Sequence, residues 1–333
     1  MDNEVTIEQE IATVEMKRPH VVVLGAGASR AACLNGDKNG NRLPLMRDLT
    51  EIIDLKTILK KWGINSDQNF EEIFSDLHAK GESEKMEEIQ KIVDEYFSKL
   101  ELPDKPTIYD HLILSLRGTD LIATFNWDPL LLQAYTRNSN LGLSLPRLAF
   151  LHGNVGVGYC EKDKKAGMFG DICKKCNKPY NGVPLLYPIK SKNYSENFFI
   201  ANEWNQLKRG FTDAFMITIF GYSGPKTDQE AISAMKEAWG DKNQRSMEQT
   251  CFITTQSEEV VSENWDSFIH THHYEVSTNF YESWISNHPR RTGEAYISQY
   301  LDAKFINNNP IPKDAEFPEL WEWYGKFRNA EKV

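Results

Sequence analysis

The chain has 333 residues, of which 40% are hydrophobic and 26% charged; this is ordinary usage for a globular protein and excludes a disordered or fibrous chain. With 38 basic and 48 acidic residues the net charge is −10, a sign that repels phosphate backbones, so we predict no direct nucleic-acid binding. No window approaches the roughly 18 apolar residues of a membrane span, and the acidic N-terminal segment does not resemble a signal peptide. We therefore expect no membrane association and a cytoplasmic location.

Short apolar runs rich in β-branched residues predict six strands, at residues 20–24, 121–125, 148–151, 215–220, 251–254 and 274–277. Stretches with helical periodicity lie between and around them, at residues 70–79, 85–100, 107–116, 128–135, 198–209, 228–239, 264–269, 279–286 and 320–327. Parallel strands need crossover connections, and helices are the usual crossover. The alternation therefore predicts an α/β fold: a Rossmann-like parallel sheet with helices on both faces.

Two blocks do not follow this alternation. Residues 49–100 are mostly helical in pattern, and residues 155–192 are rich in Cys, Lys and Gly. We predict that both are insertions, the second resembling a small zinc knuckle. No repeat and no Pro- or Ser-rich linker divides the chain, so residues 1–333 are expected to form one domain.

The first predicted strand ends directly in a glycine turn, formed by Gly25, Ala26, Gly27, Ala28 and Ser29. Glycine allows a sharp turn and a close approach to a pyrophosphate, and amides at the start of the next segment can point at the anion. Arg30 stands where the third glycine of the general dinucleotide pattern would be. The alternative is a tight strand-to-helix turn without a ligand.

Polar and small residues also follow three later strands: Asn126 and Asp128, then His152, then Gly221, Tyr222 and Ser223. Because the carboxyl ends of parallel strands meet at one edge of a sheet, we expect these residues to lie beside the glycine turn. A histidine there can act as a general base near neutral pH, although a lone histidine is more often structural. Asp128 precedes Pro129, so a purely structural role as a helix N-cap is an equal alternative for this carboxylate.

Three of the five cysteines lie close together in the second insertion: Cys160, Cys173 and Cys176. In a reducing compartment this pattern favours a metal site over disulfides. A structural zinc needs four ligands, and Asp163 or a histidine would have to complete the set; free thiols are the alternative. The lysines between residues 162 and 178 make this segment locally basic, and we expect a solvated loop.

The motifs G-A-G-A-S, T-F-N-W-D, L-H-G and F-G-Y-S, in this order, resemble the sirtuin-like NAD-consuming family over roughly residues 21–230. The resemblance implies that NAD is the substrate, held by the glycine turn and by residues 221–223. It also implies that Asn126 positions the ribose or the attacking water, that His152 is the general base, and that Asp128 orients the ribose or stabilises charge. Sirtuins often hold a structural zinc where this chain has its cysteine cluster.

Phe125 stands where sirtuin deacylases have glutamine, and no F-G-E loop follows the cysteine block. These departures resemble the bacterial sirtuin-like NAD hydrolases of antiphage defence, which deplete the host's NAD. The resemblance therefore implies hydrolysis of NAD to nicotinamide and ADP-ribose, controlled by a trigger, by homo-oligomerisation, or by a partner such as a HerA-like ATPase or an Argonaute-type protein. The alternatives are an NAD-dependent deacylase or ADP-ribosyltransferase, and a non-catalytic sensor of NAD or ADP-ribose.

Overall fold

The computed structural model describes residues 3–188, 194, 197–224, 228–241, 245, 247–266, 268–269 and 274–331. The last residues of the predicted cysteine insertion, 189–192, lie outside these ranges. Within them, every helix is too short or too polar to cross a bilayer.

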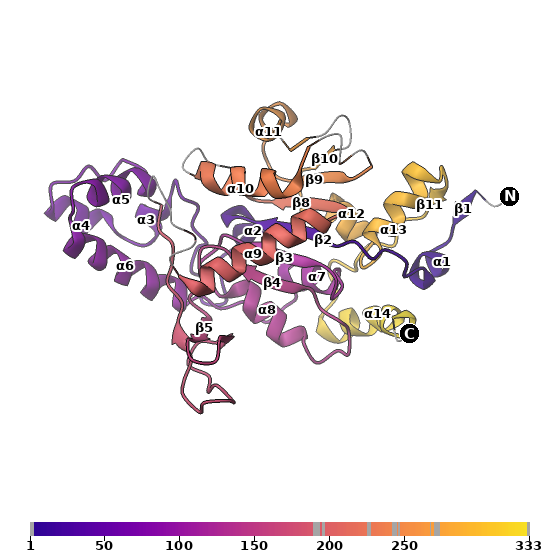
Figure 1. Cartoon of the computed structure of the whole chain (residues 1–333), viewed down its shortest axis with the longest axis horizontal. Helices are drawn as coiled ribbons and strands as arrows, with labels where there is room; N and C mark the ends of the chain where they lie inside the picture. Colours follow the sequence, from indigo (N-terminus) through magenta and orange to yellow (C-terminus); the bar gives the residue numbers. More distant parts are fainter. Residues whose placement is uncertain are drawn as a thin grey trace.

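A six-stranded sheet forms the centre of the molecule, in the order β10-β9-β8-β2-β3-β4, and all neighbouring pairs are parallel. Its strands are β2 (His20–Leu24), β3 (Leu121–Thr124), β4 (Arg147–Phe150), β8 (Met216–Phe220), β9 (Gln249–Ile253) and β10 (Tyr274–Ser277). The chain runs outward from β2 to β4 and then returns to place β8 on the other side of β2 (Figure 1). This confirms the predicted α/β architecture and puts a topological switch point between β2 and β8.

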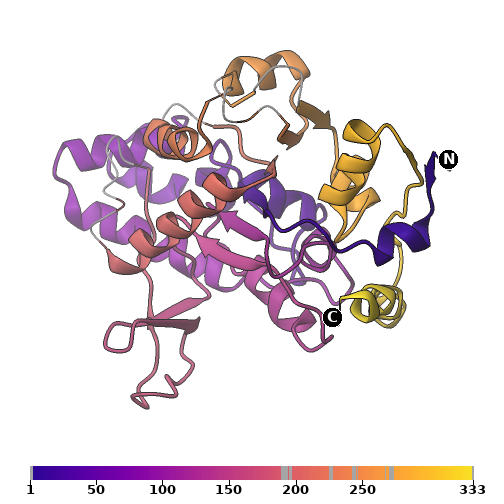
Figure 2. The ribbon, with the colours of Figure 1, turned by 45° about the vertical axis from the view of Figure 1, so that its right-hand side comes forward.

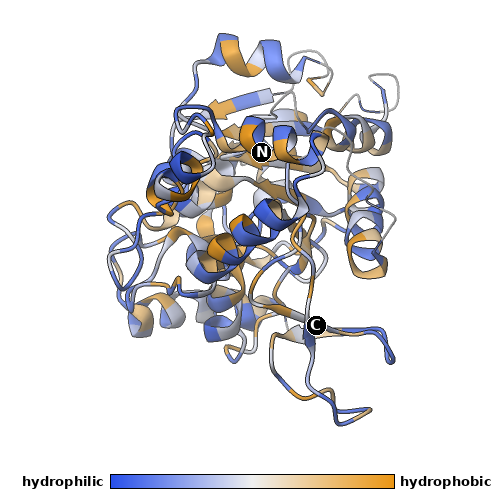
Figure 3. Cartoon of the chain, turned by 90° about the vertical axis from the view of Figure 1, so that its left-hand side faces the viewer, coloured by the Kyte–Doolittle hydropathy of each residue, from blue (hydrophilic) through white to orange (hydrophobic). Residues whose placement is uncertain are grey.

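Both faces of the sheet are buried, as the uninterrupted apolar run of β2 predicts. Val21 and Val23 belong to one core with α9 (Phe198–Asp213), α10 (Gln229–Trp239) and α11 (Glu258–Trp265). Val22 and Leu24 belong to the opposite core, with α7 (Ile108–Leu114), α8 (Leu130–Asn138) and α14 (Phe317–Ala330). Figure 3 shows mixed polar and apolar residues on the covering helices, which is typical of helices with one buried side.

The helical block contains α3 (Leu49–Ile52), α4 (Lys56–Lys61), α5 (Phe70–Ala79) and α6 (Ser83–Ser98). Asn69 caps α5 by accepting a hydrogen bond from the Glu72 amide at 2.9 Å. The rings of Phe70 and Phe97 pack edge-on against Trp127 of the main body, with centroids 6.3 and 5.8 Å away. The block therefore shares one apolar core with the sheet rather than folding around a core of its own.

The cysteine-rich segment forms a separate three-stranded antiparallel sheet that projects from the body (Figure 2). Its strands are β5 (Val157–Cys160), β6 (Lys165–Met168) and β7 (Asn181–Gly182), and we call residues 157–182 the cysteine finger. The Tyr180 ring covers the paired glycines Gly158 and Gly167, where an added Cβ would come within 2.5 Å of the tyrosine.

The terminal segments pack together at one end of the sheet. β1 (Glu4–Val5) pairs with β11 (Phe305–Ile306), and α1 (Ile7–Ala12) lies against α14. The remaining elements of this region are η2 (Phe280–Glu282), α12 (Trp284–Asn287), α13 (Thr292–Tyr296) and η3 (Ile297–Leu301).

Two sequence-based helix boundaries are wrong. The helix expected at 264–269 is α11, which begins after the N-cap Ser257 and ends at Trp265. The helix expected at 279–286 is broken in two by Ser283, whose Oγ accepts from the Ser286 amide and starts a new helix. In the second case a serine cap sets the boundary more strongly than the apolar periodicity does.

Candidate active site

The glycine turn lies at the switch point, where β2 passes into α2 (Ala26–Ala32). The Gly25 amide donates to Phe220 O and the Gly27 amide to Gly221 O, both at 3.0 Å. An added Cβ on Gly25 would lie 2.6 Å from Gly221 O, and one on Gly221, whose φ is +63°, would lie 2.3 Å from the Ala28 amide nitrogen. The glycines therefore permit a contact between two strand ends that side chains would prevent.

This contact occupies part of the predicted anion-binding surface. Besides the Gly27 amide, the Ala28 amide is used within the chain, because it donates to Gly25 O at 2.9 Å. Of the first-turn amides of α2, only that of Ala26 has no acceptor among the described residues. The Gly25, Gly27 and Ala28 amides are thus not available to a pyrophosphate.

A buried polar network joins the glycine turn to the end of β3. Asn126 Nδ2 donates to Gly25 O and to Ser29 Oγ, each at 2.9 Å, and lies 3.2 Å from the Tyr109 hydroxyl. Ser29 Oγ donates to Asp128 Oδ2 at 2.6 Å and lies 2.7 Å from the Tyr109 hydroxyl. Since the only hydroxyl proton of Ser29 goes to Asp128, Tyr109 must donate to Ser29. The network is a chain of donors that ends on the Asp128 carboxylate.

Asp128 is the electrostatic centre of this network. Asp128 is only 4% exposed, and this burial raises the pKa of its carboxyl group. The hydrogen bonds from Ser29 and from the Leu130 amide lower the pKa and offset part of the effect of burial. Burial and the nearby Asp128 charge also raise the pKa of Tyr109 well above its usual value and that of Cys33 to about 12. No described cation forms an ion pair with Asp128. A buried carboxylate without a counter-ion attracts positive charge strongly.

Asp128 supports the start of helix α8, as predicted, but from the position before the N-cap residue. Helix α8 begins at Leu130, with Pro129 rather than Asp128 at the N-cap position. Asp128 Oδ1 still accepts from the Leu130 amide at 3.2 Å. One carboxylate oxygen therefore supports the helix start, while the other ends the donor chain from Ser29.

His152 lies two residues beyond β4, as expected, and contacts the residue before Asn126 through an aromatic cluster. Its ring packs edge-on against Phe125, the residue before Asn126, with centroids 4.8 Å apart. Phe125 in turn stacks on Tyr222 at 4.4 Å. Gly153 must be glycine, because its φ is +76° and a Cβ would lie 2.1 Å from Pro184 O. The aromatic residue at position 125 thus forms an apolar wall beside the histidine.

The end of β8 completes this edge of the sheet. The Tyr222 hydroxyl donates to Asp228 Oδ2 at 3.2 Å, and burial raises the Tyr222 pKa. Ser223, by contrast, is exposed. The structure therefore brings all the predicted non-metal site residues to the carboxyl edge, in two groups: the network of Ser29, Asn126 and Asp128, and the aromatic cluster around His152.

Two residues of the site were not predicted: Tyr109 and Asn154. Asn154 Nδ2 donates to Asn126 O at 3.3 Å and to Asp128 O at 2.5 Å, which fixes the backbone that presents both side chains. Its place directly after the L-H-G motif was a signal that could have been used. Tyr109 comes from α7, and no motif or spacing connects that helix to the strand ends.

The cysteine finger brings four ligand atoms together, from Cys160, Asp163, Cys173 and Cys176, all within 4.8 Å of one another. Cys160 Sγ lies 3.5 Å from Cys176 Sγ and 3.6 Å from Asp163 Oδ2, and Cys173 Sγ lies 3.5 Å from the same oxygen. Zinc–sulfur bonds of about 2.3 Å in a tetrahedron require edges of about 3.8 Å. The donor set and its spacing therefore fit one structural zinc, with Asp163 as the fourth ligand.

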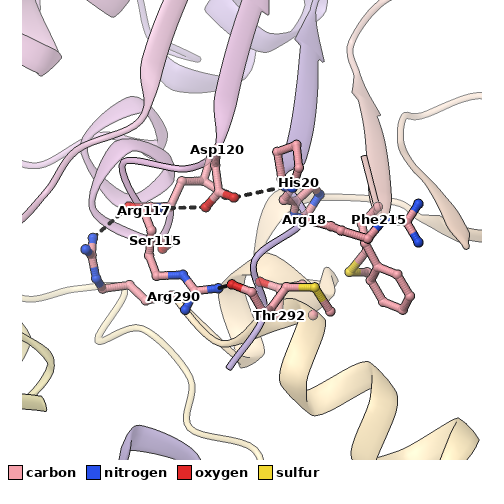
Figure 4. A pocket seen from close by; sticks show the side chains of 13 residues that line it. Arg18, His20, Ser115, Arg117, Asp120, Phe215, Arg290 and Thr292 are labelled. Carbon is pink, nitrogen blue, oxygen red and sulfur yellow. Dashed lines mark hydrogen bonds between the residues drawn. The ribbon is translucent and has the colours of Figure 1, made fainter. Parts of the chain in front are cut away.

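The opposite, amino edge of the sheet also holds buried charges, around a small pocket (Figure 4). Asp120 accepts from the His20 amide at 2.9 Å and from the Arg117 amide at 2.7 Å. Arg290 donates to the carbonyls of Leu114 and Leu116 at 3.0 and 2.6 Å. It also donates to the Ser144 carbonyl at 3.0 Å and to both oxygens of Glu331. Every donor of this guanidinium is used by the chain.

No protein-family model matches this chain, and no curated protein matches it in sequence. Similar solved structures include a mutant Sir2 homologue in complex with ADP ribose, at 14% identity and a TM-score of 0.41, covering 89% of this chain and 96% of that one. Another, described as concerning the mechanism and regulation of Sir2 enzymes, has 14% identity and a TM-score of 0.40 and covers 97% of this chain and 96% of that one. A Sir2 homologue bound to NAD has 13% identity and a TM-score of 0.35, covering 89% and 93%. Similarity at this level does not establish a shared family.

Proposed function

We propose that the chain binds NAD at the carboxyl edge of the sheet and hydrolyses the bond between nicotinamide and ribose. The observation that carries the proposal is the Asp128 carboxylate: it is buried, it lacks a counter-ion among the described residues, and it is linked to Asn126 at the switch point of the sheet. Ligands of open α/β sheets bind in the crevice at such a point. The nicotinamide ring of NAD carries a positive charge, and the ribose takes it over as the bond breaks.

Each step of this reaction has a candidate group. Nicotinamide leaves with the electron pair of the C–N bond, which places positive charge on the ribose, and the Asp128 carboxylate stabilises that charge. Asn126 Nδ2 is used within the chain, so its Oδ1 is the atom that orients the ribose or the attacking water. His152 accepts the proton that the water loses. NAD and water thus yield nicotinamide, ADP-ribose and a proton.

The remaining predicted residues would hold the nucleotide. The Ala26 amide is available to the pyrophosphate, while Gly221, Tyr222 and Ser223 form the neighbouring wall. The rings of Phe125 and Tyr222 form an apolar surface beside His152. Phe125 in place of the glutamine of deacylases supports hydrolysis over deacylation by resemblance to the NAD hydrolases.

The resemblance to antiphage NAD hydrolases supports a biological role in which the activity depletes NAD during infection. Such an enzyme must be inactive until it is needed, so we include activation by self-assembly or by a partner, a HerA-like ATPase or an Argonaute-type protein, in the proposal. The finger would hold zinc as a purely structural ion. Metal analysis should find about one zinc per chain, and Cys173→Ser should lose it.

The activity is tested by incubating the purified protein with NAD and following nicotinamide and ADP-ribose over time. Asn126→Ala and His152→Ala should each abolish turnover, whereas the matched controls Asn140→Ala and His78→Ala, both at exposed positions, should not. Product formation only after addition of an acylated peptide would instead identify a deacylase. Binding of NAD without turnover, also after addition of the candidate partners, would identify a sensor.

A further inference from the structure

The backbone turn that carries His152 is closed by hydrogen bonds directly after strand β4. The Gly153 amide donates to Phe150 O at 3.1 Å, and the Leu186 amide donates to His152 O at 2.9 Å. The Leu151 amide continues the pairing with β3. These bonds leave two backbone groups before the histidine, the Phe150 amide and the Leu151 carbonyl, to be bound by other elements.

Helix α9 supplies both partners from two adjacent residues. Glu203 Oε2 accepts from the Phe150 amide at 2.8 Å, and Trp204 Nε1 donates to Leu151 O at 3.0 Å. Both side chains are buried, so water does not compete for these bonds. Strand β4 is the outer strand of the described sheet and has a neighbouring strand on one side only. The helix therefore satisfies the free side of the strand end and fixes the two residues before His152.

The Trp204 ring also contacts the two rings that pack against the imidazole. Its centroid lies 4.3 Å from that of Tyr194 and 6.0 Å from that of Phe125. Tyr194 and Phe125 are in turn 6.2 and 4.8 Å from the His152 ring. One side chain thus holds the carbonyl before the histidine and both of these aromatic neighbours. Because packed interiors transmit displacements, a shift of Trp204 should move the imidazole.

The Phe150 amide requires an acceptor from Glu203 and does not require a charge. Oε2 of Glu203 accepts from this amide, while Oε1 accepts from Gln206 Nε2 at 3.0 Å. Glutamine has the same length and also offers a carbonyl oxygen, and the Gln206 amide can rotate to suit it. Glu203→Gln should therefore keep the bond to the Phe150 amide, whereas Glu203→Ala removes it.

We propose that Glu203 and Trp204 are positioning residues for His152. What the imidazole does in catalysis rests on the proposed hydrolysis of NAD, whereas the way in which it is held does not. A general base must lie within hydrogen-bond reach of the proton that it takes, and a displacement of about 1 Å can lower a rate about 100-fold. Loss of either contact from α9 should therefore lower kcat and leave KM for NAD unchanged.

The test is NMR of the full chain with carbon-13 at Cε1 of its eight histidines, in which His152→Ala identifies the His152 signal. Trp204→Phe keeps an aromatic ring in the core but removes the indole N–H. It should shift or broaden the His152 signal and lower kcat at least about tenfold. The matched control is Trp321→Phe, which also removes one indole hydrogen bond, of 2.9 Å to Asn138 Oδ1. It should change neither the signal nor kcat.

The two Glu203 variants separate positioning from a general loss of stability. Glu203→Ala should act like Trp204→Phe, whereas Glu203→Gln should restore the wild-type His152 signal and kcat to within about twofold. Should Glu203→Ala not fold, Trp204→Phe decides. An unchanged His152 signal in Trp204→Phe would overturn the inference, even if kcat fell. A wild type that leaves NAD intact, with the His152 signal moved as expected in Trp204→Phe, would overturn the proposed hydrolysis and support the positioning.

Discussion

The two edges of the central sheet both bury charged groups, but they treat them differently. At the amino edge, Arg290 donates all its guanidinium hydrogen bonds to three backbone carbonyls and to Glu331. At the carboxyl edge, Asp128 receives hydrogen bonds from Ser29 and from one amide but has no ion pair within the described ranges. A buried charge neutralised by the chain serves stability, whereas one left without a counter-ion is available to a ligand.

The largest effect on stability is expected for Arg290→Met at the amino edge. Arg290→Met would leave three backbone carbonyls without their donor and the Glu331 carboxylate with Arg291 as its only partner among the ion pairs of the described residues. We expect a loss of about 3–5 kcal/mol in the free energy of unfolding, measured by urea denaturation. NAD cleavage per folded molecule should not change. A loss below about 1 kcal/mol would show that the Arg290 contacts are not what stabilises this edge.

At the carboxyl edge, Asp128→Asn should lower activity without lowering stability. Without the negative charge, kcat/KM for NAD should fall about 100-fold, which corresponds to about 2.7 kcal/mol. The free energy of unfolding should stay constant or rise, because burial raises the Asp128 pKa and so disfavours the charged form in the folded state. Retained activity with lowered stability would instead assign Asp128 to helix capping alone.

The pH dependence of stability distinguishes the edges further. Burial lowers the pKa of His20 to about 3, so the unfolded chain, with a histidine pKa near 6.5, binds the proton first as the pH falls. This contribution to stability is complete above pH 6.5 and shrinks below it, by about 2 kcal/mol at pH 5. His20→Gln should reduce the difference between the free energies of unfolding at pH 7.5 and pH 5. An unchanged difference would contradict a neutral buried His20.

The smallest expected effect is that of Tyr109→Phe, which removes only the hydroxyl. Ser29 would lose one of its two donors and keep the other, Asn126. We expect the free energy of unfolding to fall by about 1 kcal/mol and kcat to fall about fivefold, with KM unchanged. The acid limb of the pH–rate profile should also shift, because Ser29 holds the Asp128 carboxylate. A purely structural role would lower stability and leave the profile in place.

The sequence predicts the frame of this site well, and its internal contacts poorly. Apolar runs locate all six strands of the main sheet, and parallel pairing then brings Gly25, Asn126 and His152 to one edge. The bond from the Gly27 amide to Gly221 O and the arrival of Tyr109 from α7 depend on tertiary packing and leave no local pattern. The finger's strands are short and rich in glycine and lysine, so periodicity does not reveal them.

The central claim is that the carboxyl edge of the sheet is the ligand site. Its most direct test is hydrogen exchange of the wild-type protein with and without ADP-ribose. We predict protection of amides in residues 24–32, 124–130 and 220–224, and unchanged exchange in residues 114–120 and 288–294 at the amino edge. Protection confined to the amino edge, or absent at saturating ADP-ribose, would contradict the account.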